Sequence, residues 1–227
     1  MLGLVLGTLR LPLIVLATGS PQMAAGTNIA VSAAAAAAGA LSHLREGRVD
    51  WTVVAWTAPP SVVGAAVGAL VADDVPEDLL YAVIAAVLVW SGIDLALRPI
   101  RARPKQRLRL VRGSGLAFGI GVLGGAVGVI LGTLRMPALI RSVGMDVRRA
   151  AGTNLVVGFL LGLTAFAVYA GTSGVDWPVL AAGLAGGIPG GWLGARATGR
   201  ISENVLRLTL GAVLVVVGVV FAVQAVG

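Results

Sequence analysis

The sequence predicts an all-α polytopic membrane protein made of two inverted repeats. Three observations predict this fold: an apolar composition, motifs that occur twice, and a distribution of charge that reverses between the copies. Hydrophobic residues make up 57% and charged residues 12% of the 227 residues, and the mean hydropathy is +0.94. Soluble domains are about 45–50% apolar and about 25% charged. The absence of cysteine excludes disulfides and thiolate metal sites.

Three short motifs of the first half return in the second half. The first is identical at six of seven positions, and the second, Ala-Ala-Gly-Thr-Asn, is unchanged. The pairs are residues 6–12 with 131–137, 24–28 with 150–154, and 49–51 with 175–177. A duplication of this length in an apolar chain is typical of secondary transporters. We therefore divide the chain into transmembrane repeat 1 (1–97), a basic connector (98–112) and transmembrane repeat 2 (113–227).

Long apolar runs predict three transmembrane helices in each repeat. Each run is long enough to cross about 30 Å of hydrocarbon as a helix. The runs are 24–44, 51–72 and 79–97 in repeat 1, and 150–170, 177–198 and 205–226 in repeat 2.

The first element of repeat 2 is a glycine-rich run, residues 113–128, that leads into the 131–137 motif. Glycine is too dense there for a regular helix interior, which predicts a broken or re-entrant element. Such an element must be buried in protein or line a cavity. In repeat 1 the same element is expected to be truncated, because Met1 corresponds to Ala126. Either its first half is missing or the start codon lies further upstream.

Basic residues predict which loops are cytoplasmic. The connector 98–112 holds seven of the seventeen basic residues and no acid. In repeat 2 the loops after the first and third elements carry arginines, within 141–149 and 196–207, whereas the equivalent loops of repeat 1 are uncharged (18–23) or acidic (73–78). An inverted repeat predicts this exchange of sides. Three helices and one re-entrant segment supply the odd number of crossings that inversion requires.

A Gly-Thr-Asn motif stands near the predicted start of the second helix of both repeats. Its residues are Gly26, Thr27 and Asn28 in repeat 1, and Gly152, Thr153 and Asn154 in repeat 2. A helix start combines free backbone amides with the positive end of the helix dipole, which favours anions. The alternative is that the motif caps the helix and hydrogen-bonds a neighbouring one. Both interpretations are kept.

Arg10 and Arg135 lie in apolar stretches, each two residues before a proline, Pro12 or Pro137. A charge at mid-bilayer costs about 2.5–3.5 kcal/mol on insertion scales, so such residues usually face a cavity, a partner or a pathway. The guanidinium fork matches the oxygens of sulfonates, carboxylates and phosphates. The alternative is snorkelling to the interface. We predict that these four residues and both Gly-Thr-Asn motifs bind substrate, and we predict no catalytic or metal site.

Three other residues carry weaker signals. His43 is the single histidine and receives little weight as a proton relay. Asp50 and Asp176 are interpreted as helix N-caps, each followed by a tryptophan that anchors the helix at the membrane interface.

The residues together resemble the sulfite exporter TauE/SafE family of membrane transporters. The resemblance rests on two halves that each contain a Gly-rich broken element ending in proline, an Ala-Gly-Thr-Asn segment and a Gly-Val-Asp-Trp-like helix start. It implies movement of small anions, typically sulfite, organosulfonates or related sulfur and carboxylate compounds, across the cytoplasmic membrane. The family's signatures fall on Pro12, Pro137 and the two Gly-Thr-Asn motifs. The short first element departs from the family pattern, which leaves the completeness of one half of the site open. The arginines depart from it as well, which points to a subgroup with its own substrate.

We therefore expect a secondary anion transporter, multi-pass in the cell membrane, with export or uptake of its substrate. No Gly-x-x-x-x-Gly-Lys-Ser/Thr motif is present, so the energy must come from an ion gradient or the substrate gradient. The expected partners are a small anion and the bilayer, without cofactor or nucleic acid; the coupling ion, proton or sodium, and homo-oligomerisation are left open. An intramembrane enzyme lacks a suitable acid/base or metal constellation. The remaining alternative is a membrane-embedded structural or assembly protein.

Overall fold

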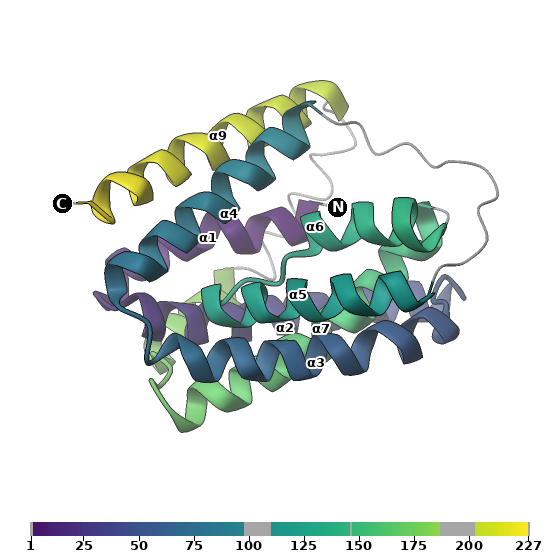
Figure 1. The fold of residues 1–227 in the computed structure, drawn as a ribbon, viewed down its shortest axis with the longest axis horizontal. Helices are drawn as coiled ribbons and strands as arrows, with labels where there is room; N and C mark the ends of the chain where they lie inside the picture. The colour runs from purple at the N-terminus through teal and green to yellow at the C-terminus, as the bar shows by residue number, and fades with distance from the viewer. Residues whose placement is uncertain (1, 98–109, 146, 187–202, 227) are drawn as a thin grey trace.

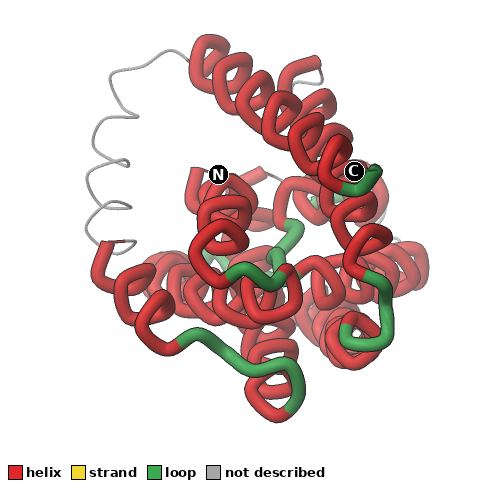
Figure 2. The backbone as a smooth tube through the Cα atoms, turned by 90° about the vertical axis from the view of Figure 1, so that its left-hand side faces the viewer, coloured by secondary structure: helices red, strands yellow, loops and turns green. Residues whose placement is uncertain are grey.

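The protein folds into long, nearly aligned helices joined by short loops (Figures 1 and 2). The computed structural model describes residues 2–97, 110–145, 147–186 and 203–226, and these contain no strand. The helices are α1 (Leu2–Thr18), α2 (Pro21–Arg45), α3 (Trp51–Ala72), α4 (Glu77–Leu97), α5 (Leu110–Val127), α6 (Gly132–Pro137), the π-helix η1 (Ala138–Val143), α7 (Val147–Gly171), the helical residues 177–186, and α9 (Glu203–Gln224).

The all-α fold expected from the sequence is confirmed for the described residues, and helices lie in five of the apolar runs and in the described part, 177–186, of the sixth. Among the described residues, three helices are long and apolar enough to cross a membrane: Pro21–Arg45, Trp51–Ala72 and Arg149–Gly171. Most of the connector, residues 98–109, and the predicted helical residues 187–198 lie outside the described residues, as do Arg196 and Arg200.

Successive elements run in alternating directions. In Figure 1, α1, α3, α5, α7 and α9 run from right to left, whereas α2, α4, the α6–η1 segment and residues 177–186 run from left to right. Corresponding elements of the two halves therefore point in opposite directions: α1 and α6–η1, α2 and α7, α3 and 177–186, α4 and α9. The α5–α6–η1 element begins and ends at the right-hand end, since its second part returns beside the first.

The glycine-rich run of residues 113–127 is helical, contrary to the expectation that glycine would break it. Close packing on α3 is the physical reason. A side chain at Gly121 or Gly125 would overlap the carbonyl oxygens of Ser61 and Ala65 on α3. Small residues let membrane helices approach this closely, so tertiary packing outweighs the low helix propensity of glycine.

The predicted break is present, but it follows the glycine-rich helix. The helix α5 ends in a Schellman motif, in which the Gly128 amide donates to the Gly125 carbonyl (3.3 Å) and the Val129 amide to the Gly124 carbonyl (3.0 Å). Gly128 has a left-handed φ of 70°, and a side chain there would overlap Ala25 of α2. Only glycine meets both requirements.

The two prolines of the repeated motif stand in different settings. Pro137 is the last residue of α6, and the chain continues directly as the π-helix η1. Pro12 lies inside α1, which continues to Thr18. Of the two prolines, Pro137 therefore ends an α-helix and Pro12 does not. Because proline has no N–H, a change of helical hydrogen bonding is favoured at that point.

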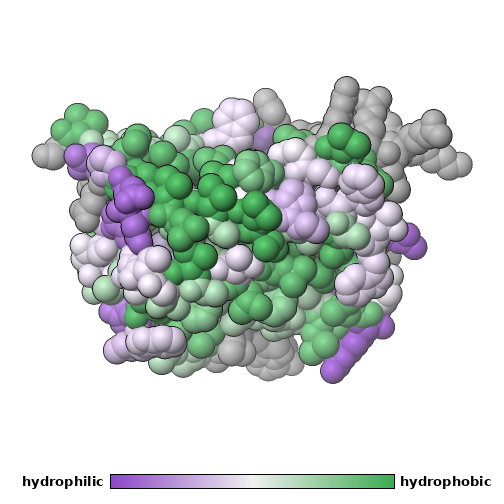
Figure 3. Space-filling view, turned by 60° about the horizontal axis from the view of Figure 1, so that its bottom comes forward, coloured by the Kyte–Doolittle hydropathy of each residue, from purple (hydrophilic) through white to green (hydrophobic). Residues whose placement is uncertain are grey.

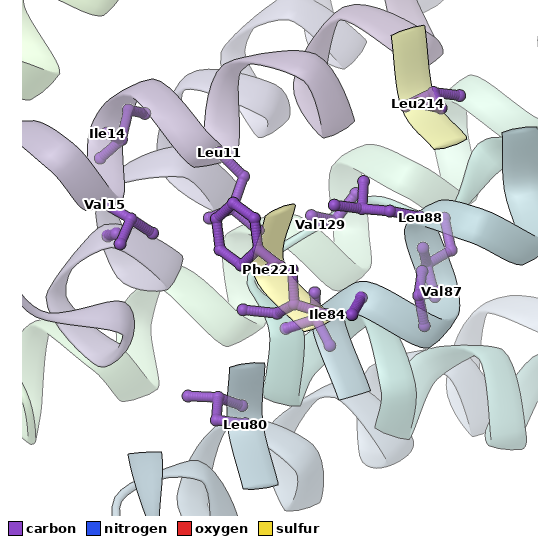
Figure 4. Packing of buried hydrophobic residues seen from close by; sticks show 14 of the residues in the cluster. Leu11, Ile14, Val15, Leu80, Ile84, Val87, Leu88, Val129, Leu214 and Phe221 are labelled. Atoms are coloured by element: carbon purple, nitrogen blue, oxygen red, sulfur yellow. The ribbon is translucent and has the colours of Figure 1, made fainter. Parts of the chain in front are cut away.

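The two halves are interleaved. The most extensive helix contacts join elements from different halves: α3 with α5, α4 with α9, and α2 with α7. The largest apolar cluster also draws on both halves, with Leu11, Leu80 and Ile84 packed near Val129, Leu214 and Phe221 (Figure 4). The halves do not form separate cores.

Apolar side chains cover much of the outer surface. Figure 3 shows them across the middle of one face, with the most hydrophilic residues mainly toward its left and right edges, where helix ends lie in Figure 1. Exposed apolar side chains include Val63, Leu70, Trp90 and Val216, on α3, α4 and α9. A surface of this kind suits contact with lipid rather than water.

Candidate functional site

Arg10 is held against α2 by three hydrogen bonds. Its Nε donates to the Oδ1 atom of Asn28 (3.0 Å), and its Nη2 donates to the Asn28 carbonyl (3.2 Å) and to the Ser32 hydroxyl (2.8 Å). Asn28 and Ser32 are one turn apart on the same face of α2. The half-buried guanidinium therefore has protein partners along one whole edge.

Arg135 is buried and largely without partners. Only 2% of it is exposed, and its Nη1 donates to the Oδ1 atom of Asn154 on α7 (3.3 Å). Its Nε and Nη2 atoms are buried, and among the described residues they have neither a hydrogen-bond partner nor an ion pair. A buried charge without a counter-charge is unfavourable. The position is therefore suited to an anion.

Both arginine–asparagine pairs meet the chain at the α5–α6 break. The Nδ2 atom of Asn28 donates to the Gly128 carbonyl (2.8 Å), and that of Asn154 donates to the Gly132 carbonyl (3.3 Å). Gly128 and Gly132 stand on either side of the break. The two asparagines thus connect the guanidinium groups to the irregular backbone, whose carbonyls have left the regular helical pattern.

The Gly-Thr-Asn motifs do not open their helices. The helix α2 begins at Pro21 after an N-cap by Ser20, whose hydroxyl accepts from the Met23 amide (3.4 Å), and α7 begins at Val147. Gly26 and Gly152 therefore lie inside helices, beyond the free amides of the first turn. The expectation of a helix start at the motif is wrong, because Ser20 and Pro21 form an earlier N-terminus.

The two threonines make crossed contacts between the halves. The Thr27 hydroxyl accepts from the Asp176 amide (3.0 Å), and the Thr153 hydroxyl accepts from the Asp50 amide (3.0 Å). The two aspartates are N-caps, as predicted: Asp50 accepts from the Val53 amide (3.1 Å) and Asp176 from the Val179 amide (2.9 Å). Each threonine therefore fixes a helix start in the other half.

The motif glycines allow the same crossed packing. A side chain at Gly26 would meet the Gly174 carbonyl at 2.9 Å, and one at Gly152 would meet the Arg48 carbonyl at 2.5 Å. Of the predicted site residues, the structure thus joins Arg10 to Asn28 and Arg135 to Asn154. It places the threonines and glycines at contacts between the halves, and the prolines in α1 and at the end of α6.

A cavity of about 200 Å³ lies between the two halves. Ser32, Gly39 and His43 of α2 line it, together with Ile130 and Met136 near the break; its other lining residues are Gly7, Ala35, Ala36, Ala151 and Leu155. It is smaller than the roughly 300–1,000 Å³ of pockets for drug-sized ligands, so its size suits a small ion. It touches Ser32, the partner of Arg10, and Met136, the neighbour of Arg135.

Two residues of this region were not selected from the sequence. Ser32 carried no signal beyond its position one turn after Asn28, which its role as an Arg10 partner now explains. His43 was given little weight, yet it lines the cavity and its Nδ1 atom is buried without a partner among the described residues. Its counterpart 126 residues later is Tyr169, which packs against Gly26 as His43 packs against Gly152.

The chain is similar over most of its length to several membrane proteins. A "Probable membrane transporter protein YdhB" of Bacillus subtilis (strain 168) is 27% identical over 190 residues, covering 81% of this chain and 78% of that protein. A "Probable membrane transporter protein" of Xylella fastidiosa (strain 9a5c) is 27% identical over 220 residues, covering 93% and 84%. A "Probable membrane transporter protein ORF9" of Sinorhizobium sp is 27% identical over 221 residues, covering 96% and 83%.

No solved structure matches the chain. The family described as "Sulfite exporter TauE/SafE" matches residues 1–221. This match extends across both halves, including both arginine–asparagine pairs and the α5–α6 break. The protein is accordingly a multi-pass membrane protein of the sulfite exporter TauE/SafE family, a family of membrane transporters.

Proposed function

We propose that this protein is a secondary transporter that exports or takes up small anions, such as sulfite, organosulfonates or related sulfur or carboxylate compounds, across the cell membrane. The observation that carries the proposal is Arg135, a 2% exposed cation with two nitrogen atoms that have no partner in the described ranges of the chain. The family description supports sulfite as the first substrate to test.

An oxyanion fits the unpartnered atoms of Arg135. The Nε–H and the adjacent Nη2–H point in the same direction and form one edge of the planar guanidinium, which binds two oxygens of a sulfonate or carboxylate in parallel. An anion bound there would neutralise the buried charge and use both donors. Transport requires that the anion bind and leave reversibly. No protein carboxylate among the described residues pairs with Arg135, so the anion would not have to displace one.

We also propose that the chain consists of two inverted repeats, residues 1–97 and 113–227, joined by a cytoplasmic connector at 98–112. The opposite directions of corresponding elements support inversion. The crossed contacts of Thr27 with Asp176 and of Thr153 with Asp50 support it as well. Thr153 and Asp176 are the equivalents of Thr27 and Asp50, 126 residues later, so exchanging the halves turns one contact into the other. Transporters with inverted repeats bind substrate where the two halves meet near the midplane.

The energy source in this proposal is an ion gradient or the substrate gradient. A proton or a sodium ion is the candidate coupling ion, and a homo-oligomer is compatible with the large exposed apolar surface. Neither is assigned to particular residues here.

Flux into proteoliposomes tests the proposal. Purified protein should accelerate entry of radiolabelled sulfite, a sulfonate or acetate relative to protein-free liposomes. Arg135→Gln should remove most of this flux, and Arg135→Lys should reduce affinity, since lysine keeps the charge but lacks the planar fork. The second candidate, a structural or assembly protein, predicts no flux of any of these anions from folded protein.

A further inference from the structure

The two arginines occupy equivalent positions but differ in their hydrogen bonding. In the first half, Arg10 donates from Nε to Asn28 and from Nη2 to Ser32. In the second half, Arg135 reaches Asn154 only through Nη1. The edge of the guanidinium formed by Nε and Nη2 is therefore occupied by the protein in Arg10, whereas in Arg135 it has no partner among the described residues.

One difference in sequence lies beside the guanidinium of Arg135, next to its Nη1 atom. The residue 126 positions after Ser32 is Gly158, and a Cβ atom built there would lie 3.6 Å from the Nη1 atom of Arg135. The position equivalent to Ser32 is thus beside the guanidinium but carries no hydroxyl. Because glycine offers no side-chain acceptor, this position adds no partner to Arg135, whose Nε and Nη2 donors have none among the described residues.

From this asymmetry we propose that Arg135 is the anion-binding arginine, that Arg10 is a positioning residue, and that Gly158 keeps the Arg135 site vacant for the anion. This inference rests on the proposed transport of small anions and narrows its site to one of two repeated positions. The ligand class is a small oxyanion with two oxygens that can face one guanidinium edge.

The surroundings of Gly158 are consistent with a binding position. A Cβ atom at Gly158 would lie 3.0 Å from Ile130, and Ile130 also lines the cavity between the halves. Met136, the residue after Arg135, lines the same cavity. The segment that carries the free guanidinium therefore borders the space through which a small anion could approach.

Arg10 has the opposite arrangement. Its hydrogen bonds to Asn28 hold the amide in the orientation that donates to the Gly128 carbonyl at the break. An anion could reach the same edge of Arg10 only after these bonds to Asn28 and Ser32 were broken. Arg10 thus fixes the break from one side, while Arg135 binds on the other.

A pair of substitutions at one position separates the effect of a hydroxyl from the effect of added volume. Gly158→Ser adds an acceptor beside Arg135, and Gly158→Ala adds a methyl group of similar size without one. We expect Gly158→Ser to weaken binding of radiolabelled sulfite to the purified protein by about tenfold or more, the effect of one hydrogen bond to a charged group. Gly158→Ala should bind within about threefold of the parental protein, because Ile130 can move slightly.

Ser32→Gly is the reciprocal variant. It removes one of the two acceptors of the Arg10 Nη2 atom, which keeps the Asn28 carbonyl. Sulfite binding through Arg135 should stay within about threefold of the parental value, because Ser32 bonds Arg10 and the asparagine partner of Arg135 is unchanged. Equal affinity in Gly158→Ser and Gly158→Ala, together with parental flux, overturns this inference and leaves the transport proposal intact.

Should Gly158→Ser not yield folded protein, the arginine variants decide the matter. Arg135→Gln must lose sulfite binding while folded Arg10→Gln retains it; the reverse pattern assigns the anion to Arg10 and contradicts the proposal. A folded parental protein that neither binds nor transports sulfite, a sulfonate or acetate overturns both this inference and the proposed function.

Discussion

Asn154 touches both parts of the candidate site, since its amide accepts from Arg135 and donates to the Gly132 carbonyl. Asn154→Asp would place a carboxylate against the buried guanidinium. We expect sulfite flux to fall by about tenfold or more, because an internal counter-charge competes with the anion for Arg135. Flux into proteoliposomes measures this effect.

Asn154→Ala is the matched control for that prediction. Both variants lose the hydrogen bond to Gly132, and only the aspartate adds a negative charge. Alanine should weaken transport less than aspartate does. Its own effect also includes the lost hydrogen bond from the charged Arg135, worth about 1.5–3 kcal/mol. Equal flux in the two variants would show that the charge does not matter, and with it that no anion binds at Arg135.

The sequence predicted which polar residues matter better than it predicted their partners. Arg10, Arg135, Asn28 and Asn154 were selected because a charge or a repeated polar motif in an apolar chain requires a reason. Their pairing depends on the approach of α1 to α2 and of α6 to α7, which no local pattern encodes. The similar spacing within the two pairs, 18 and 19 residues, is the signal that could have revealed it.

The packing of α5 on α3 provides a prediction about a whole helix. Gly125→Ala should destabilise the protein by about 1–3 kcal/mol, because its new Cβ would overlap the Ala65 carbonyl, which belongs to a rigid helix backbone. Gly119 lies on the same helix with nothing within 4 Å of its Cβ position. Gly119→Ala should be neutral or stabilising by up to about 1 kcal/mol, since alanine favours helix.

Thermal unfolding in detergent distinguishes the two glycine variants. Equal stability of both would mean that α3 and α5 are separated in the membrane, contrary to the observed packing.

The break between α5 and α6 is held from α7 by Tyr169. This buried side chain places its hydroxyl 2.8 Å from the Gly125 carbonyl and 3.0 Å from the Ala126 carbonyl, at the end of α5. Tyr169→Phe should lower the free energy of unfolding by about 1–3 kcal/mol, because buried carbonyls lose a donor. Thr172→Val removes an exposed hydroxyl just after the end of α7, three residues from Tyr169. It should change the free energy of unfolding by less than about 0.5 kcal/mol.

A Tyr169→Phe protein as stable as the parental one would show that water or another group satisfies these carbonyls. The measurement is denaturation monitored by helical circular dichroism.

Helix positions followed closely from hydropathy, because each apolar run has to cover a membrane-facing or buried surface. Residues 51–72 were predicted as one helix, and α3 has these bounds. The glycine-rich run was misjudged, since the density of glycine at 113–127 reflects close contact with α3 rather than a break. The break itself required knowledge of Gly128, whose left-handed conformation and contact with Ala25 depend on the assembled fold.

At the scale of the whole molecule, the main helix contacts and the crossed threonine contacts join the two halves. Neither half therefore contains its own complete core, and a relative movement of rigid halves would disrupt contacts on every side. We expect that access to the site changes through smaller shifts at the α5–α6 break, where Asn28 and Asn154 bind backbone carbonyls. The cavity beside Ile130 and Met136 lies next to this break.

The orientation of the two halves in the membrane follows from where their helix ends lie. In Figure 1 the α2 end near Arg45 lies at the right, and the equivalent α7 end near Thr172 lies at the left. The acidic loop with Asp74 joins α3 to α4 at the left as well, and α4, which the basic connector follows in the sequence, ends at the right. Basic segments remain on the cytoplasmic side. The right-hand end should therefore be cytoplasmic and the left-hand end external.

Single cysteines in this cysteine-free chain test that orientation with an impermeant thiol reagent. On intact cells, Asp74→Cys and Thr172→Cys should be labelled, whereas Arg45→Cys and Gln106→Cys should react only after the membrane is permeabilised. The unsubstituted protein controls for other reactions. Labelling of Arg45→Cys and Thr172→Cys from the same side would mean that equivalent helix ends share a side, which parallel repeats require and inverted repeats forbid. Labelling of Gln106→Cys on intact cells would instead show that the orientation is the reverse of the one proposed. The seven basic residues of the connector would then lie outside the cell, contrary to the positive-inside rule.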